Sequence, residues 1–414
     1  MALPRIIPAL ADLTQDIAGP LPLELLHAWA SGDQNAAEAG HLLDAYRITG
    51  TVVASDTSGL SRLTEERDLL DVLALVSAPK QIVHGVGVAV GGRPIGVWTA
   101  DNTEMFYPAT VAAGLVVDAM AEAQTRIAAG GPLRIGMCIH RGEFFEVGGG
   151  LYSRDAEIVE HLAEDHAGPG EVLLTRAITD QLGDAHASSF TPRTELAGIF
   201  APGVFALSAP RGLPDISPRE DPYPHPFTQE FFGLLSGLRH ADDPSLARKR
   251  IYDAYLRERV VVFLAKATEQ ESPDALQRLL DGFVSTALME TVLKVGMRAG
   301  DHVAGLGGGL AILTFDTPRE SLDFAQAVRV RFAENGVVVK IGIDRGPVLV
   351  FAGQHGHGGI SGDPVNIASK LSEDSGAVGK IRISARAMLG MSVPADAQPF
   401  AVTISRIALT GVEL

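Results

Sequence analysis

The 414-residue chain has one cysteine, Cys138, and no long run of apolar residues. A single cysteine excludes an internal disulfide framework and fits a reducing compartment, so we expect a cytoplasmic protein. No run approaches the roughly 20 apolar residues of a membrane-spanning helix, so we expect no membrane partner. The first 20 residues contain Asp12 and Asp16 and have prolines inside their apolar part, which makes them a poor secretory signal.

Basic residues are also scarce, with 34 Lys and Arg against 50 Asp and Glu and a net charge of −16. Without a basic face to neutralise phosphates, nucleic acid is not an expected partner. Any polyanion would have to be bound locally, by a metal ion and a few placed donors. A hydrophobic content of 46% supports real cores, and the length suggests two or three domains.

Two stretches of the chain, 23–46 and 227–255, share one order of expected elements. Each has an apolar helix, a break, a second helix that ends in Asp-Ala-Tyr, and then an apolar strand. Tyr46 and Tyr255 are 209 residues apart, and the same offset places Asp56 on Ala265. We infer a duplication whose halves have diverged at this position.

The repeat continues through the rest of each half. The strand at 133–136 is expected to match 339–342, and the helix at 156–164 is expected to match 365–373. Alternating strands and helices predict α+β sandwiches with helices on one sheet face. A proline-rich stretch between the halves predicts an extended, stiff linker. The expected domains are residues 1–208 with their N-terminal helices, the linker 209–226, and residues 227–414 with theirs.

A candidate site begins where the first strand of the repeat ends. Val52 and Val53 predict a buried strand that ends at Asp56. The residues that turn the chain after it are Thr57, Ser58, Gly59, Leu60 and Ser61. A carboxylate followed by backbone amides suits a metal-bound polyphosphate. An ordinary turn or helix cap is the alternative interpretation.

A second carboxylate, Asp101, follows at an expected hairpin tip. Two Asp on neighbouring strand ends form an oxygen-rich pair of the kind that holds Mg²⁺ against a triphosphate. The second half has no carboxylate there, but it offers Asn366 and Lys370 on one helix face. These side chains suit a phosphate whose charge grows during reaction. They could instead be a helix cap and a solvated lysine.

Four strings in this order resemble the class III adenylate/guanylate cyclase homology domain, present twice in the chain. They are Asp56-x-x-Gly-Leu-Ser, Ala-Asp101-Asn, Arg134-Ile-Gly and Gly-Asp-Pro-Val-Asn366-x-x-x-Lys370. The resemblance implies two ferredoxin-like (βαββαβ) domains in an intramolecular head-to-tail pseudo-dimer, with the nucleotide at their interface.

The resemblance also assigns roles. It makes Asp56, Asp101 and the backbone of Thr57 the metal ligands. It makes the 57–61 turn and Arg134 the phosphate-binding groups. It makes Asn366 and Lys370 the side chains that stabilise the transition state. The pseudo-symmetric second site, with Ala265, Gly308, Glu157 and His161, is expected to be inactive.

Three departures from the family pattern weaken the prediction of catalysis. Lys370 replaces a transition-state Arg, which exchanges a planar fork for a point charge. Ala304 and Gly359 stand at the base-reading positions, and Thr410 at that of a phosphate-binding Lys. We therefore expect a monomer that binds a nucleoside triphosphate, most simply ATP, with Mg²⁺, Mn²⁺ or Ca²⁺ and little or no cyclase activity. The alternatives are an active cyclase that makes a 3′,5′-cyclic purine or pyrimidine nucleotide and pyrophosphate, and an interaction protein with a vestigial cleft.

Overall fold

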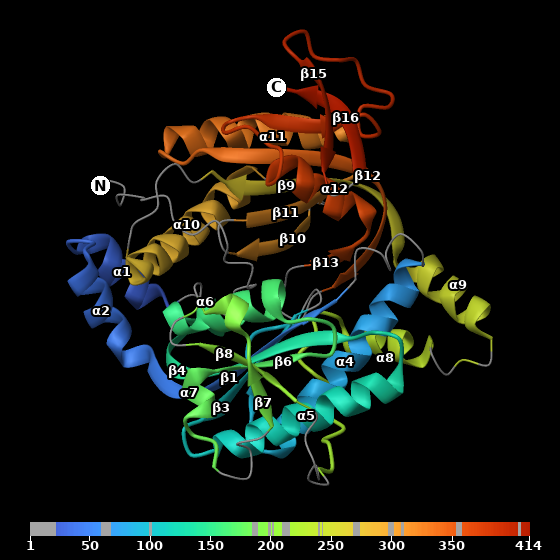
Figure 1. Cartoon of the computed structure of the whole chain (residues 1–414). Coiled ribbons are helices and arrows are strands. Elements are labelled where there is room, and N and C mark those ends of the chain that lie inside the picture. The colour runs from blue at the N-terminus through green and yellow to red at the C-terminus, as the bar shows by residue number, and fades with distance from the viewer. Residues whose placement is uncertain are drawn as a thin grey trace. The chain divides into compact units, whose positions relative to one another are not determined.

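The structure is a computed structural model in which two compact units are distinguished (Figure 1). The described residues are 22–58, 68–98, 102–183, 189–197, 200, 203–208, 216–238, 241, 243–267, 274–296, 302–307, 310–352, 358–404 and 407–414. We call Leu43–Pro226 with Leu235–His240 the N-unit. The C-unit comprises Met1–Leu42, Phe227–Leu234 and Ala241–Leu414.

The N-unit is built on one sheet with the strand order β2-β3-β1-β4-β6-β8-β7, and β5 pairs with β4. Its core elements are β1 (Arg47–Thr57), α4 (Leu69–Ala89), β2 (Arg93–Pro94), β3 (Thr103–Pro108), α5 (Ala113–Gly130) and β4 (Ile135–Val147). These are followed by β5 (Gly150–Tyr152), α6 (Arg154–His161), a π-helical turn (Leu162–His166), β6 (Val172–Thr175), α7 (Arg176–Thr179), β7 (Phe190–Pro192) and β8 (Val204–Leu207). Short 3-10 turns lie at Asp44–Tyr46 and Thr194–Leu196.

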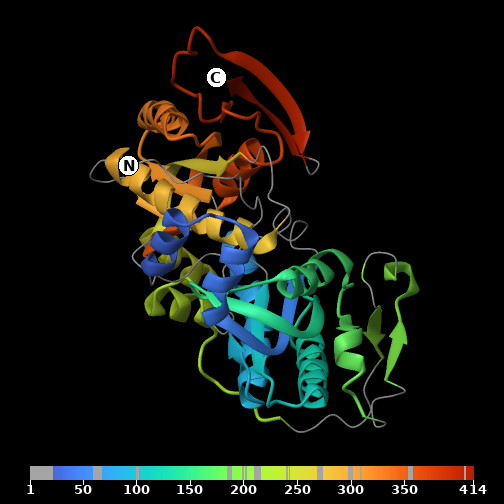
Figure 2. The same ribbon diagram turned by 90° about the vertical axis from the view of Figure 1, so that its left-hand side faces the viewer.

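The C-unit repeats that order as β10-β11-β9-β12-β14-β16-β15, with β13 paired to β12. Its elements are α1 (Leu23–Ser31), α2 (Ala36–Leu43), α8 (Gln229–Gly237), α9 (Pro244–Tyr255), β9 (Leu256–Lys266), α10 (Ala275–Gly296), β10 (His302–Gly307), β11 (Leu310–Phe315) and α11 (Pro318–Glu334). After these come β12 (Val339–Ala352), β13 (Gly358–Ser361), α12 (Asp363–Ser372), β14 (Ile381–Ser384), β15 (Gln398–Ile404) and β16 (Ile407–Glu413). The β15–β16 hairpin extends beyond the rest of its sheet (Figures 1 and 2).

Both units confirm the expected βαββαβ core. In the N-unit the chain runs β1-α4-β2-β3-α5-β4, and the four strands lie in the order β2-β3-β1-β4 with every neighbouring pair antiparallel. The C-unit runs β9-α10-β10-β11-α11-β12 with the same order and the same pairing. The chain is thus a tandem of two α+β domains of one topology.

Asp56 and Ala265 are confirmed as equivalent, because each is the tenth of the eleven residues of its strand, β1 or β9. In the strand register, Asp56 lies opposite Gly136 and Ala265 lies opposite Lys340. The same register corrects the predicted match of the next strand. Gly136 corresponds to Lys340 rather than to residue 342, so the counterpart of Arg134 is Val338. Side chains alternate between faces with a period of two, so a two-residue slip leaves every apolar residue on its own face. The hydrophobic pattern therefore could not reveal the error.

Helices cover both faces of each sheet, so the expectation of a single covered face is wrong. In the N-unit, Val52 and Val159 belong to one core that joins the sheet to α6. On the opposite face, the backbone of Gly87 in α4 lies against Met105 of β3. The C-unit has one core that includes Phe324 of α11 and another that includes Ala368 of α12. Strand cores such as 260–265, apolar on both faces, need this double cover.

The two N-terminal helices are grouped with the C-unit, although the sequence analysis assigns them to residues 1–208. Trp29 of α1 is fully buried, and its Nε1 donates a hydrogen bond to Asp281 Oδ1 of α10 at 3.0 Å. Gln277 Nε2 donates to the Gln34 carbonyl at 2.9 Å. An apolar helix face shows that a partner exists but not which helix supplies it, so the sequence could not settle this placement.

The described part of the linker, 216–226, is docked along α4 of the N-unit. The amide of Arg219 donates to the Gly85 carbonyl at 2.9 Å, and the amide of Trp98 donates to the Pro224 carbonyl at 2.8 Å. Tyr223 is buried and stacks on Trp98, with ring centroids 5.9 Å apart. Among the described helices, α4 alone has the length and hydropathy of a membrane span, and 56% of its apolar window is buried inside the protein.

Candidate functional site

The structure brings three of the predicted site segments to one end of the N-unit sheet. Asp56, half-buried, is the next-to-last residue of β1. The Ser58 amide donates a hydrogen bond to the Arg134 carbonyl oxygen at 3.1 Å, which ties the turn after β1 to the chain entering β4. The Ser55 and Thr103 hydroxyls hydrogen-bond at 2.6 Å, where β3 begins. Asp56, Ser58 and the start of β3 therefore converge.

Part of the predicted site lies outside the described residues: Gly59, Leu60, Ser61 and Asp101 of the N-unit, and Gly308 of the C-unit. Within the described residues, no group of three or more His, Cys, Asp or Glu side chains could hold a metal ion. Asp56 and the Thr57 carbonyl are the described members of the expected ligand set.

Arg134 has a structural role in addition to the one predicted for it. Its Nη1 donates to the carbonyls of Gly131 and Leu133, each at 2.8 Å, and its Nη2 to Ala128 at 3.5 Å. These carbonyls lie at or just beyond the end of α5, where the last turn of a helix leaves acceptors without intrahelical donors. Phosphate binding by Arg134 stays a prediction, and it would require the guanidinium to exchange these partners.

Helix α12 carries Asn366 and Lys370, and its first residues explain where it begins. Gly362 precedes it with φ of 157°, and a Cβ there would lie 2.9 Å from the Pro347 carbonyl oxygen, so glycine is needed. Asp363 and Pro364 then open the helix, as acidic residues and proline favour a first turn. Asn366 is exposed.

Lys370 lies one turn beyond Asn366, and the surroundings of its ammonium reduce its reach as a phosphate ligand. Its side chain is 17% exposed, and Nζ lies 3.6 Å from Asp374 Oδ2. The positive charge is thus shared with a carboxylate in the turn just beyond the end of α12.

The positions that depart from the family pattern agree with weak base recognition where they are described. A Cβ on Gly359 would lie 2.0 Å from Phe351 Cε2, so this position leaves no room for a base-reading side chain. Thr410 of β16 is exposed and carries no charge. Ala265 is buried in the sheet and cannot bind a metal.

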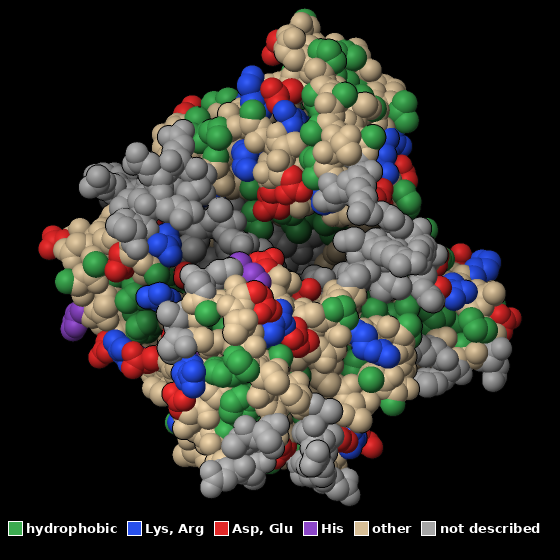
Figure 3. Space-filling view, in the orientation of Figure 1, with side chains coloured by type: hydrophobic (Ala, Val, Ile, Leu, Met, Phe, Trp, Pro, Cys, Tyr) green, Lys and Arg blue, Asp and Glu red, His purple; other side chains and the backbone are tan. Residues whose placement is uncertain are grey.

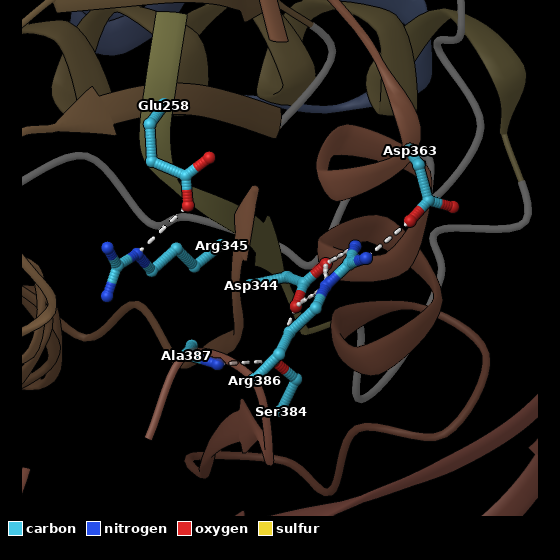
Figure 4. Close-up of polar contacts among 7 residues, drawn as sticks. All are labelled: Glu258, Asp344, Arg345, Asp363, Ser384, Arg386 and Ala387. Carbon is cyan, nitrogen blue, oxygen red and sulfur yellow. Dashed lines mark hydrogen bonds and ion pairs between the residues drawn. The ribbon is translucent and has the colours of Figure 1, made fainter. Parts of the chain in front are cut away.

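A buried polar cluster that no sequence motif predicts lies beside α12 (Figure 4). Asp344 of β12 is 0% exposed. Arg386 Nε lies 2.7 and 2.8 Å from its two carboxylate oxygens, and Nη2 also contacts Oδ2. Ser384 Oγ hydrogen-bonds to Asp344 Oδ1. Arg386 Nη1 reaches Asp363 Oδ2 at 2.6 Å. The paired carboxylates raise the pKa of Arg386 further above its usual value. The only sequence signal was an aspartate inside an apolar strand.

In the N-unit, the equivalent strand carries a cluster around His140 in place of the Asp344–Arg386 cluster. His140 of β4 contacts Thr175 Oγ1 through Nδ1 at 2.9 Å, and its Nε2 lies 3.3 Å from Asp155 Oδ1. Asp155 also accepts the Glu143 amide at 2.8 Å. Burial alone would raise the pKa of Asp155, but the bonds from His140 and from the Glu143 amide outweigh it and hold that pKa below its usual value. In both units a polar network thus ties the sheet to the start of the following helix.

That N-unit helix, α6, has Glu157 and His161 in place of Asn366 and Lys370. His161 Nδ1 lies 2.6 Å from Asp165 Oδ2 in the π-helical turn that follows. A carboxylate and a His–Asp pair are poorly suited to an anion, as the sequence analysis expects for the inactive site. On the face drawn in Figure 3, the described Lys and Arg side chains are scattered among Asp and Glu.

No family model matches the chain, and no curated protein sequence matches it. A class III adenylyl cyclase-like ATP-binding protein from Pseudomonas aeruginosa is similar in structure over 84% of this chain and 85% of that chain, with 14% identity and a TM-score of 0.47. The guanylate cyclase domain of RhGC from Catenaria anguillulae, solved with GTP, covers 38% of this chain and 96% of its own, with 18% identity and a TM-score of 0.31. An adenylate/guanylate cyclase/hydrolase from Silicibacter pomeroyi covers 38% of this chain and 96% of its own, with 17% identity and a TM-score of 0.30. The chain has two α+β domains of one topology, and the solved structures to which it is similar include cyclase-like proteins.

Proposed function

We propose that the chain binds a nucleoside triphosphate, most simply ATP, together with a divalent metal ion. The observation that carries the proposal is the convergence at the end of β1. There the Ser58–Arg134 hydrogen bond joins the residues after Asp56 to the chain that enters β4, and the Ser55–Thr103 hydrogen bond joins β1 to the start of β3. We propose that Asp56 holds the metal and that amides further along the 57–61 turn take the phosphate oxygens, because the Ser58 amide is already bonded to the Arg134 carbonyl.

The chemistry of the proposed ligands favours a hard cation. Asp56 and the Thr57 carbonyl supply oxygen only, which favours Mg²⁺, Mn²⁺ or Ca²⁺ over softer metals. Asp101 precedes Thr103 by two residues, and Thr103 pairs with Ser55, so we propose Asp101 as the second carboxylate. When bound, such an ion offsets the charge of a triphosphate that a chain of net charge −16 would otherwise repel.

We further propose that Asn366 and Lys370 contact the triphosphate while turnover is weak or undetectable. Asn366 is exposed and able to donate, whereas Lys370 shares its charge with Asp374. Gly359 offers no side chain to hold a base. A loosely oriented ribose is costly for an in-line attack. The proposal therefore describes a monomeric cytoplasmic nucleotide-binding protein derived from an enzyme fold.

Calorimetric titration with ATP and each of the three metals tests the proposal. We expect a stoichiometry near one and no binding without metal. Asp56→Ala and Asp101→Ala should each abolish binding, because each removes a metal ligand. Glu157→Ala is the matched control, because Glu157 belongs to the second site that is expected to be inactive, and this variant should bind as the wild type does. Unchanged affinity in both Asp variants would refute the metal assignment.

A further inference from the structure

We propose that Arg386 is a positioning residue that fixes the start of α12 and, through it, Asn366. The proposal rests on the function proposed above, because it concerns the presentation of Asn366 to the nucleotide. It assigns no contact with the ligand to Arg386 itself.

Arg386 is anchored on one side by its pair with Asp344, which belongs to the sheet. Asp344 is fully buried, and its two oxygens take contacts from Nε and Nη2 of Arg386 and from Ser384 Oγ. A buried carboxylate is costly unless it is paired and hydrogen-bonded, so this pair cannot open without a large loss of stability. The Ala387 amide donates to Ser384 Oγ at 3.1 Å and closes the cluster. Arg386 is therefore held in one orientation by the sheet.

Helix α12 is the element whose position this anchored side chain would fix. Arg386 directs its remaining terminal nitrogen, Nη1, to Asp363 Oδ2 at 2.6 Å, and Asp363 is the first residue of the helix (Figure 4). Residues three apart lie on one side of a helix, so Asp363 and Asn366 share that side. A shift at Asp363 is thus carried directly to Asn366. Gly346 adds a second contact, since a Cβ there would lie 3.1 Å from Pro364 Cγ.

Charge explains why one Arg serves both carboxylates. Asp363 lies in the first helical turn, where a negative charge is favourable and a positive charge alone would not be. Arg386 can approach this helix end because two carboxylates surround its guanidinium. Its side chain is 40% exposed and that of Asp363 61% exposed, so the outer pair can exchange with solvent while the inner pair stays.

The N-unit provides an internal control for this device. Asp155 lies in the first turn of α6 and joins it to His140 of β4, as Asp363 joins α12 to Arg386. Helix α6 carries Glu157 and His161, which have no role in the proposed binding. Cutting the N-unit link should therefore disturb a helix without disturbing the ligand.

The experiment compares Asp363→Asn, Asp363→Glu and Asp155→Asn in the full chain. All three leave the buried Asp344–Arg386 pair intact, so each is expected to fold. An exposed ion pair accounts for up to roughly fivefold in an equilibrium constant, so we expect Asp363→Asn to weaken ATP–Mn²⁺ binding by about that factor. Asp363→Glu keeps the negative charge and should bind with the wild-type affinity. Asp155→Asn should also bind with the wild-type affinity.

Hydrogen exchange read from peptides of α12 and α6 separates the two proposals. Asp363→Asn should speed exchange at the start of α12 only, and Asp155→Asn at the start of α6 only. A wild type that binds no nucleotide would overturn the proposed function while this readout still tests the tether. Unchanged α12 exchange in Asp363→Asn would overturn the positioning role. So would an equal loss of affinity in Asp155→Asn, because the loss would then be a general one.

Discussion

At the scale of single residues, the proposed site has an acidic side chain for a metal, Asp56, and a lysine, Lys370, where the resembling family has a transition-state Arg. Lys370 is one strongly hydrated ammonium on a flexible stem, and Asp374 lies 3.6 Å from it. An Arg at the same helix position would present several directed N–H groups, and two could reach a phosphate while Asp374 held another.

We therefore predict that Lys370→Arg raises the formation of 3′,5′-cyclic nucleotide. Removal of one donor aimed at the developing charge costs on the order of 10²-fold in turnover elsewhere, so its return should be visible against a weak background. Chromatography of reactions with ATP, GTP, CTP and UTP in Mn²⁺ measures the product. Lys370→Gln is the control and should form none. Robust turnover by the wild type would refute weak catalysis.

At the scale of elements, the placement of α1 shows how a buried side chain near the N-terminus contributes to the stability of the C-unit. Trp29 is fully buried and donates to Asp281, and Lys266 at the end of β9 lies within electrostatic reach of the same carboxylate. Burial raises the pKa of Asp281 to about 6, against the bond from Trp29 and the charge of Lys266. Burial likewise lowers the pKa of Lys266 to about 8, against the attraction of Asp281.

Truncation of Trp29 tests the attachment of α1. Trp29→Ala should lower the free energy of unfolding of the C-unit by about 3–5 kcal/mol, the usual cost of removing a buried Trp. Trp29→Phe keeps most of the apolar contact but loses the N–H donor, so it should lie between the wild type and Ala. Denaturant unfolding followed by circular dichroism gives the comparison. Equal stability of all three proteins would contradict the packing of α1 on α10.

The Asp281 carboxyl predicts a pH dependence of stability. A pKa raised in the folded state means that the folded protein holds this proton more tightly than the unfolded chain does. Its contribution is therefore complete below about pH 4 and is lost as the pH rises through about 6. Asp281→Asn should flatten that fall, since Asn still accepts the Trp29 bond but does not titrate. Melting temperatures from pH 4 to pH 7 provide the test, and parallel curves would contradict it.

At the scale of the whole molecule, the sequence predicted the features that follow from local patterns, such as the order of helices and strands. It did not predict which distant segments pack against one another. The shared helix–strand order and the repeated Asp-Ala-Tyr revealed the duplication and matched Asp56 to Ala265. The common sheet order and the equal positions of the two residues in β1 and β9 confirm both. The two-residue error in matching 133–136 arose because it preserves the facing of every side chain. The Asp344–Arg386 cluster joins residues 42 apart in sequence, and no local pattern pairs them. Asp101 and most of the 57–61 turn lie outside the described residues, so their roles stay predictions.

The position of α1 also has a consequence for synthesis. Trp29 and its partner Asp281 are separated by 252 residues, yet the bond between them belongs to one unit. A ribosome that adds 5–20 residues per second needs roughly 13–50 s to make that stretch. During this time the apolar face of α1 is without its final partner, while the intervening N-unit sequence can fold. The first helix of the described residues is thus among the last to find its partner, and a chaperone has that interval in which to hold it.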